Sequence, residues 1–227
     1  MSSPKRLART AGLLYLGLVL FMAPPALVVR ERVTVSGDAA ATAANIAADA
    51  TLFRLGFVSD LVGITLYLLL GMALYLLLRH VNAAVAATLM VFVALGTAIY
   101  TVNLLNHVAA LTAATDGGSD ALALFFLDLH GHGYNLAQVY FGLWLLPLGY
   151  LAYRSGYFPR ALGVLLMVAA GTHLVEVFTQ FLFPGVAEAT ILLLQSPAIV
   201  AEFWMLGYLL VTGVRVPDAR PAEPVAA

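Results

Sequence analysis

Residues 53–78 read FRLGFVSDLVGITLYLLLGMALYLLL, and this stretch decides the fold class. About 20 mainly apolar residues in a helix are enough to cross a hydrocarbon core roughly 30 Å thick. The stretch exceeds that length, and Asp60 is the one acidic residue within it. It therefore predicts a membrane-spanning helix that carries a carboxylate.

The composition of the whole chain has the same character. Of its 227 residues, 62% are hydrophobic and 10% are charged, whereas a soluble domain carries about 25% charged residues. The chain is therefore predicted to be an integral membrane protein with the lipid bilayer as its partner. Its 11 Lys and Arg against 12 Asp and Glu give no basic excess for nucleic acid. The lack of cysteine excludes disulfides, thiolate metal ligands and a cysteine nucleophile.

Six stretches are long and apolar enough to span a membrane, so we expect an all-α polytopic bundle of six transmembrane helices. One domain is expected over residues 1–214, followed by a disordered cytoplasmic tail over 215–227. The basic residues before the first span suit a retained anchor, and a cleaved signal peptide is the alternative. The expected spans are 7–29, 53–78, 84–113, 133–153, 161–183 and 197–214.

Prolines and glycines mark where these helices should bend, begin or break. Pro24, Pro25 and Pro147 lie inside spans and predict bends there. Ser196-Pro197 predicts the start of the sixth helix. Residues 36–51, SGDAAATAANIAADAT, predict a short interfacial helix on the outer surface, with a plain connector as the alternative.

The fourth helix should be broken near its start. Residues 121–153 would form about 50 Å of continuous helix, which is longer than the bilayer requires. Gly131 and Gly133 alternate with histidines in this stretch, and glycine releases the backbone from helical geometry. We therefore expect a short separate helix or a kink at these glycines.

The distribution of basic residues predicts the orientation. Six spans place eight Lys and Arg residues on one side and three on the other, and cytoplasmic loops carry the excess. Both termini are therefore expected in the cytoplasm, with the protein in the cell membrane. The eight are Lys5, Arg6, Arg9, Arg79, Arg154, Arg160, Arg215 and Arg220, and the three are Arg30, Arg32 and Arg54.

Polar residues inside the spans are the candidates for function, because a charged side chain there costs about 2.5–3.5 kcal/mol. The spacing of Asn103, Asn106 and His107 places them on one helix face. By their distances from the helix ends, the polar groups of five helices lie in the outer half. We therefore expect one cavity open to the outer side above an apolar inner half. The candidates are Asp60, Asn103, His107, His130, Tyr134, Gln138, His173, Glu176 and Glu202.

Histidines with carboxylates are ligands that zinc, iron and manganese accept, so a divalent metal ion is the expected cofactor if one is bound. His107, His173 and Glu176 are the predicted metal ligands, with Asp60 and Glu202 completing the set or orienting the histidines. A proton relay through the same groups is an alternative. A haem between His107 and His173 and a purely structural polar network are two more.

Several segments also resemble a known family. Residues 52–60 (LFRLGFVSD), 103–106 (NLLN), 126–134 (FLDLHGHGY) and 149–160 (GYLAYRSGYFPR) are similar to the bacterial domain-of-unknown-function 4386 membrane proteins. The resemblance covers about residues 6–214. It implies a multi-pass membrane protein and brings no reaction, ligand or catalytic residue with it.

The sequence thus predicts a membrane protein whose outer-facing intramembrane site binds a metal ion or a small polar or amphiphilic ligand, with hydrolytic or redox chemistry left open. A small-solute or proton transporter is one alternative, although the inner half is apolar and no internal repeat is evident. A structural or regulatory membrane protein is the other. The sequence does not indicate the substrate or the oligomeric state.

Overall fold

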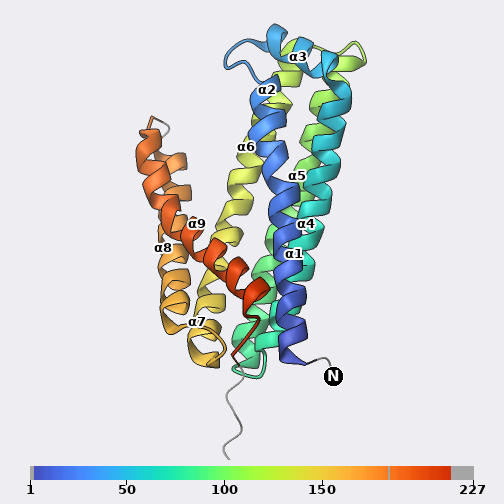
Figure 1. The fold of residues 1–227 in the computed structure, drawn as a ribbon. Coiled ribbons are helices and arrows are strands. Elements are labelled where there is room, and N and C mark those ends of the chain that lie inside the picture. Colours follow the sequence, from blue (N-terminus) through green and yellow to red (C-terminus); the bar gives the residue numbers. More distant parts are fainter. Residues whose placement is uncertain (1–2, 184, 216–227) are drawn as a thin grey trace, which may run out of the picture.

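The computed structural model describes residues 3–183 and 185–215, which form helices joined by short connections (Figure 1). Six segments are long and apolar enough to cross a membrane, which confirms the polytopic all-α bundle. Residues 216–227 of the predicted tail lie outside the described residues. The helices are α1 (Pro4–Pro24), η1 (Pro25–Arg30), α2 (Glu31–Val33), α3 (Ala39–Ala48), α4 (Ala50–Leu78), α5 (Ala83–Thr115), α6 (Asp120–Leu143), α7 (Leu145–Ser155), α8 (Arg160–Leu182) and α9 (Glu188–Val211).

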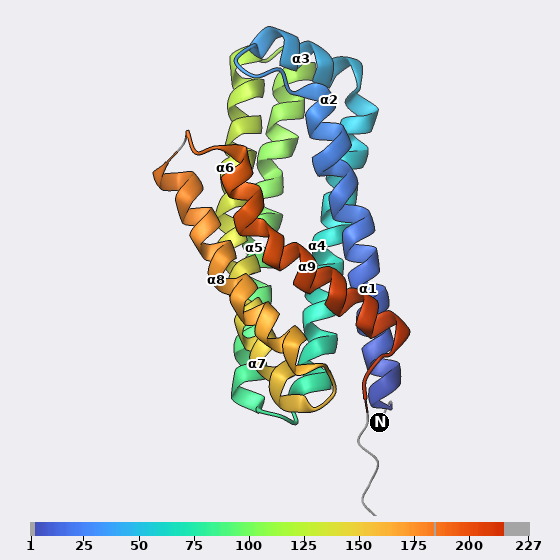
Figure 2. The same cartoon turned by 60° about the vertical axis from the view of Figure 1, so that its left-hand side comes forward.

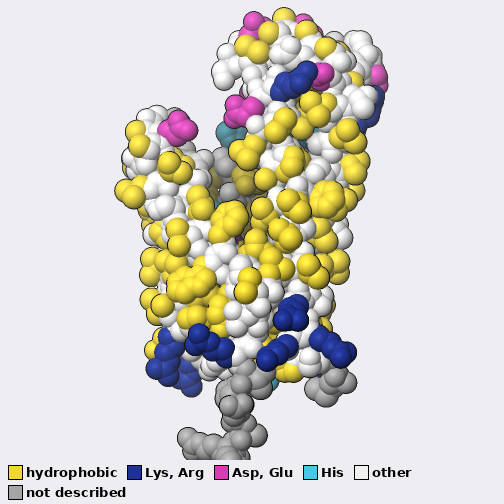
Figure 3. All heavy atoms as spheres, viewed as in Figure 1, with side chains coloured by type: hydrophobic (Ala, Val, Ile, Leu, Met, Phe, Trp, Pro, Cys, Tyr) yellow, Lys and Arg dark blue, Asp and Glu magenta, His cyan; other side chains and the backbone are white. Residues whose placement is uncertain are grey.

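The long helices stand side by side, with α1 against α4, α4 against α5, and α5 against α6. Helices α7, α8 and α9 complete the bundle, and α9 returns to α1 near the lower end (Figures 1 and 2). The N-terminus and the end of α9 both lie at this lower end. In the view of Figure 3, Lys and Arg side chains gather there. The fold therefore has the even number of crossings that the sequence predicts.

Helix α3 is the predicted short helix, and it lies across the upper ends of α4, α5 and α6 (Figures 1 and 2). Gly37 has a φ of +76° in the preceding turn, and the Asp38 carboxylate caps α3 by accepting from the Ala41 N–H at 2.9 Å. Arg32 and Asp49 form a 2.6 Å ion pair that joins α2 to the end of α3. The upper ends of α4, α5 and α6 are thereby covered.

The first span departs from α-helical geometry at the prolines where the sequence predicts a bend. Residues Pro25–Arg30 form a π-helix between α1 and α2. Pro25 has no N–H to offer the carbonyl of Phe21, and that carbonyl instead accepts from the Ser59 hydroxyl of α4 at 2.7 Å. A neighbouring helix thus satisfies the freed backbone group, as membrane helices require.

The predicted break at Gly131 and Gly133 is wrong in its position, because α6 runs through both glycines and ends at Leu143. The helix is interrupted at Trp144, between the end of α6 and the start of α7. The Trp144 N–H still donates to the carbonyl of Tyr140 at 3.1 Å, so the interruption is local. Pro147 explains this position, since it cannot donate to the carbonyl of Leu143.

The sixth span starts earlier than predicted, at Glu188 rather than at Pro197. Pro197 lies in the interior of α9, where it leaves the carbonyl of Leu193 without its helical donor. The Ser196 hydroxyl donates to that carbonyl at 2.8 Å. Pro197 therefore lies within a helix instead of beginning one, and the Ser196 hydroxyl replaces the backbone hydrogen bond that Pro197 cannot make.

Two apolar clusters enclose the polar part of the bundle. The larger one includes Leu74, Leu89 and Leu166 and occupies the lower part of the packed helices. The smaller one lies under α3 and contains Val29, Val33, Ile46, Phe53, Ala110 and Leu127. Along α4, α5 and α6 the buried polar residues fall between these clusters, so they are covered from above as well as from below.

Candidate functional site

Three buried side chains from three helices meet between the two apolar clusters. Asp60 comes from α4, His107 from α5 and His130 from α6, and each is at most 1% exposed. Each offers one ligand atom, and these atoms lie within 4.8 Å of one another. The set therefore has the size of a metal-coordination shell, whose ligands lie about 2 Å from the ion.

Arg30, at the end of η1, reaches into this group. Its Nη1 donates to Nε2 of His130 at 2.8 Å and lies 3.5 Å from Oδ2 of Asp60. A guanidinium only donates hydrogen bonds, so Nε2 of His130 accepts and carries a lone pair. The proton of His130 is then on Nδ1, which lies 3.4 Å from the carbonyl of Asn103.

The tautomer of His107 follows from the same reasoning. Its Nε2 lies 3.0 Å from the carbonyl of Phe53, which can only accept, so Nε2 carries the proton. Nδ1 of His107 therefore carries the lone pair, and it has no hydrogen-bond partner among residues 3–183 and 185–215. Within the same residues Oδ1 of Asp60 is also without a partner. Two atoms that can bind a metal ion, Nδ1 of His107 and Oδ1 of Asp60, are thus buried and unsatisfied.

Neighbouring residues hold the two imidazoles in place. The Phe53 ring stacks on His107 with ring centroids 3.9 Å apart. The Asn103 amide donates to the carbonyl of His130 at 2.8 Å, and Asn106 donates to Oδ1 of Asn103 at 3.0 Å. A Cβ on Gly133 would lie 2.0 Å from Oδ1 of Asn103. Gly133 therefore permits close approach of α5 and α6, which is a packing role.

The group lies in the upper part of the bundle, farther above the start of α5 than the thickness of a hydrocarbon core. His107 is 24 residues from Ala83, the start of α5, or about 36 Å along the helix, and the hydrocarbon core is roughly 30 Å thick. Asp60 and His130 are at the corresponding level of α4 and α6, because their ligand atoms are close to that of His107. The group is therefore in the half of the bundle opposite the N-terminus, and the outer orientation of that half stays a prediction. The site is buried beneath α3 and is not an open cavity.

The other predicted residues lie elsewhere. His173 and Glu176 are on α8, with His173 Nδ1 3.8 Å from Oε2 of Glu176. Gln180 and Gln195 both donate to Oε1 of Glu176, Gln195 at 3.2 Å. Helix α6 packs between α5 and α8, which do not contact each other within the described part of the chain. The predicted ligands His107, His173 and Glu176 therefore do not come together as one set.

Tyr134, Gln138, His173 and Glu202 line a different cavity, between α1, α4, α6, α8 and α9. Gln138 donates to the Tyr134 hydroxyl at 3.2 Å. Glu202 is 14 residues into α9, near its middle, because the helix begins at Glu188. Its expected depth was wrong for that reason.

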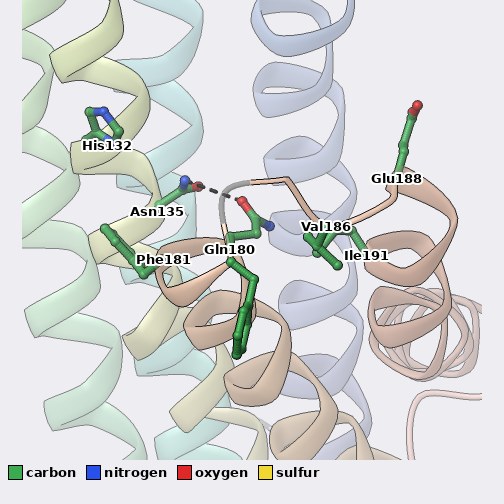
Figure 4. Close-up of a pocket in the computed structure, with 8 residues that line it drawn as sticks. His132, Asn135, Gln180, Phe181, Val186, Glu188 and Ile191 are labelled. Atoms are coloured by element: carbon green, nitrogen blue, oxygen red, sulfur yellow. Dashed lines mark hydrogen bonds between the residues drawn. The ribbon is translucent and has the colours of Figure 1, made fainter.

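A third recess, of about 430 Å³, lies between the middle of α6 and the upper ends of α8 and α9 (Figure 4). Asn135 donates to Oε1 of Gln180 there at 3.4 Å, and exposed His132 lies nearby. Glu188 points away from the other labelled side chains. These polar groups do not converge on one point.

Arg30 is the site residue that the sequence analysis missed, since it was counted only as an outer-side charge. A signal was present, because Arg30 directly follows the apolar run of the first span. A basic residue at that depth can reach an acidic one such as Asp60 on the next helix. Its side chain is 22% exposed, so it also links the buried group to the surface.

These features define a multi-pass helical membrane protein with a buried histidine and aspartate cluster. The chain matches the family described as "Domain of unknown function (DUF4386)" over residues 10–213 and belongs to that family. It is also similar to an uncharacterized protein of Archaeoglobus fulgidus, with 31% identity over 126 residues. That match covers 54% of this chain and 67% of the relative. No solved structure matches the chain.

Proposed function

We propose that this protein binds a transition-metal ion through Asp60, His107 and His130. The observation that carries the proposal is the convergence of three ligand atoms from three helices within 4.8 Å. Support comes from the unpartnered Nδ1 of His107 and Oδ1 of Asp60 within the described residues, because buried polar atoms otherwise find partners. Two imidazoles and one carboxylate suit zinc, iron or manganese.

The same set favours an ion with an open coordination position. Three protein ligands leave a place for water or substrate, which is the arrangement of catalytic rather than structural zinc sites. A metal ion at such a position polarises its bound water or a substrate carbonyl. Hydrolytic or redox chemistry near the membrane surface is therefore the reaction class that this ligand set supports.

A second candidate role is structural, and the position of Arg30 favours it. Its guanidinium contacts both Asp60 and His130, at 3.5 and 2.8 Å, and thus supplies a positive charge to the buried carboxylate. A metal ion bound to Nε2 of His130 would have to displace this hydrogen bond, because that nitrogen has one lone pair. In the metal-binding role an ion lies beside Nε2 of His130, whereas in the structural role the Arg30 guanidinium lies there.

Elemental analysis of the detergent-purified protein tests the metal proposal. Cells are grown with zinc, iron and manganese supplied together, and the protein is purified without an affinity resin that holds metal. We expect a stoichiometric amount of one transition metal, removed by a strong chelator and restored by adding back that metal. Only trace metal after this preparation, with no uptake on reconstitution, would exclude the metal site and leave the structural role.

We also propose that both termini face the cytoplasm, so that the cluster lies toward the outer side. Seven of the eight basic residues predicted for the inner side are described, and they belong to segments at the lower end of the bundle, whereas Arg30, Arg32 and Arg54 belong to the upper end. Because the chain has no cysteine, single cysteines report topology cleanly. A membrane-impermeant maleimide should label Ser119→Cys in intact cells and Ala227→Cys only after lysis. Labelling of Ala227→Cys in intact cells would contradict the orientation.

A further inference from the structure

A cavity of about 470 Å³ lies between α1, α4, α6, α8 and α9, and none of Asp60, His107 and His130 lines it. It forms because α1 and α9 cross near the lower end and diverge above it (Figures 1 and 2). The crossing is tight at Gly12, where a Cβ would lie 3.0 Å from the backbone nitrogen of Leu210. Its volume is within the range of small-molecule sites.

Aromatic rings form much of the inner wall. Tyr67 lies edge-on to Phe141 and to Trp144, with ring centroids 5.2 and 5.3 Å apart, and Tyr15 lies 6.2 Å from Trp144. The hydroxyls of Tyr15 and Tyr67 are buried and have no hydrogen-bond partner within the described residues. Because aromatic rings and hydroxyl oxygens both attract a cation, a wall of this composition suits a cationic ligand.

Glu202 is the one carboxylate among the residues that line this cavity. Over residues 3–183 and 185–215, no Lys, Arg or His side chain lies within ion-pair distance of it, since the ion pairs there involve Asp60, Asp49 and Glu176. An acidic group in the middle of a transmembrane helix is costly without a partner. Among the described residues that line the cavity there is no Lys or Arg, and its one histidine, His173, lies within ion-pair distance of Glu176 and not of Glu202. The cavity therefore has a carboxyl group and aromatic walls but no basic side chain paired with that carboxyl.

The mouth of the cavity opens toward lipid. Leu27 of η1 and Ile199 and Phe203 of α9 line the cavity and are 72%, 45% and 57% exposed. These apolar side chains belong to segments that are long and apolar enough to span a membrane. A ligand reaching Glu202 by this path would pass through hydrocarbon, so it must itself be lipophilic.

We propose that this cavity binds a lipophilic ammonium compound, with the cationic nitrogen between Glu202 and the rings of Tyr67 and Trp144. The carboxylate supplies the opposite charge, the ring faces supply cation–π attraction, and the apolar mouth holds the hydrocarbon part. This site is separate from the proposed metal site and does not depend on it.

Trp144 fluorescence in a Trp204→Phe background provides the test, because the chain has two tryptophans. The protein in phosphatidylcholine nanodiscs is titrated with dodecyltrimethylammonium, and dodecanol and dodecyl sulfate serve as neutral and anionic controls. We expect a saturable change with the ammonium compound alone. Glu202→Gln should weaken it at least tenfold, whereas Glu188→Gln, a matched change at the exposed start of the same helix, should leave it unaltered.

A second variant tests the cavity without changing Glu202, so the test does not depend on whether Glu202→Gln folds. Ala198 lines the cavity and is 6% exposed, so Ala198→Phe fills the space and leaves the carboxylate in place. We expect this variant to lose the saturable signal as well. Equal binding of dodecanol, unchanged binding in Glu202→Gln, unchanged binding in Ala198→Phe, or no saturable signal in the parent protein would each overturn the proposal.

Discussion

Replacing His130 by alanine will reduce the metal content of the purified protein to background. The imidazole offers a lone pair on Nε2 toward the cluster, and its loss leaves two of the three ligands. His107→Ala and Asp60→Asn should have the same effect, because each removes one ligand atom of the set. Elemental analysis of variants prepared together with the parent protein measures the result.

His173→Ala is the matched control. His173 is a histidine of the same bundle, and both its ring nitrogens lack hydrogen-bond partners in the part of the chain that the structure describes. It should keep the parent metal content, and so should His80→Ala at the lower end. Loss of metal in His173→Ala with retention in His107→Ala would contradict the ligand set.

Arg30 separates the metal proposal from the structural one. In a purely structural network, Arg30→Gln leaves the Asp60 carboxylate buried and unpaired, which costs about 3–5 kcal/mol of unfolding free energy. Adding zinc, iron or manganese should not repair that loss. In a metal site the ion takes the place of the guanidinium, so metal should raise the melting temperature of Arg30→Gln and a chelator should lower it again.

The positions of Asp60, His107 and His130 were predictable in part from the sequence. Each is a polar residue in an apolar helix, and counting residues from the helix ends places them at one level. The count could not show which helices are neighbours. His107 and His173 were assigned to one site because their depths agree, but α6 packs between α5 and α8. Depth is a property of each helix, whereas adjacency depends on the packing of all six.

The sequence predicts a helix start at Pro197 and a helix break at Gly133, and both predictions are wrong because a neighbouring group lets the helix continue. Pro197 was assigned to the start of a helix, yet the hydroxyl of Ser196 repairs the helix interior around it. Gly133 was assigned to a break, yet the helix continues and Asn103 occupies the space where a side chain would be. In both cases the deciding contact is an atom whose position the local sequence does not indicate.

Replacing Gly163 by valine should strongly destabilise the packing of α7 against α8. A Cβ on Gly163 would lie 2.7 Å from the backbone nitrogen of Tyr153 and 2.8 Å from the carbonyl oxygen of Gly149. A Cβ on Gly149 would in turn lie 2.7 Å from the carbonyl oxygen of Gly163. Helices α7 and α8 thus meet backbone to backbone, which is how small residues allow membrane helices to approach closely.

The obstructing atoms belong to the backbone, so rotation of a side chain cannot relieve the overlap. We therefore expect Gly163→Val to lower the free energy of unfolding by about 3 kcal/mol, the upper part of the usual range for overpacking. The melting temperature in detergent should fall by roughly 6–12 °C at this chain length. Gly171→Val is the matched control, because Gly171 lies two turns further along α8 with nothing within 4 Å of its Cβ position. Equal melting temperatures for the two variants would mean that α7 and α8 are not packed at these glycines.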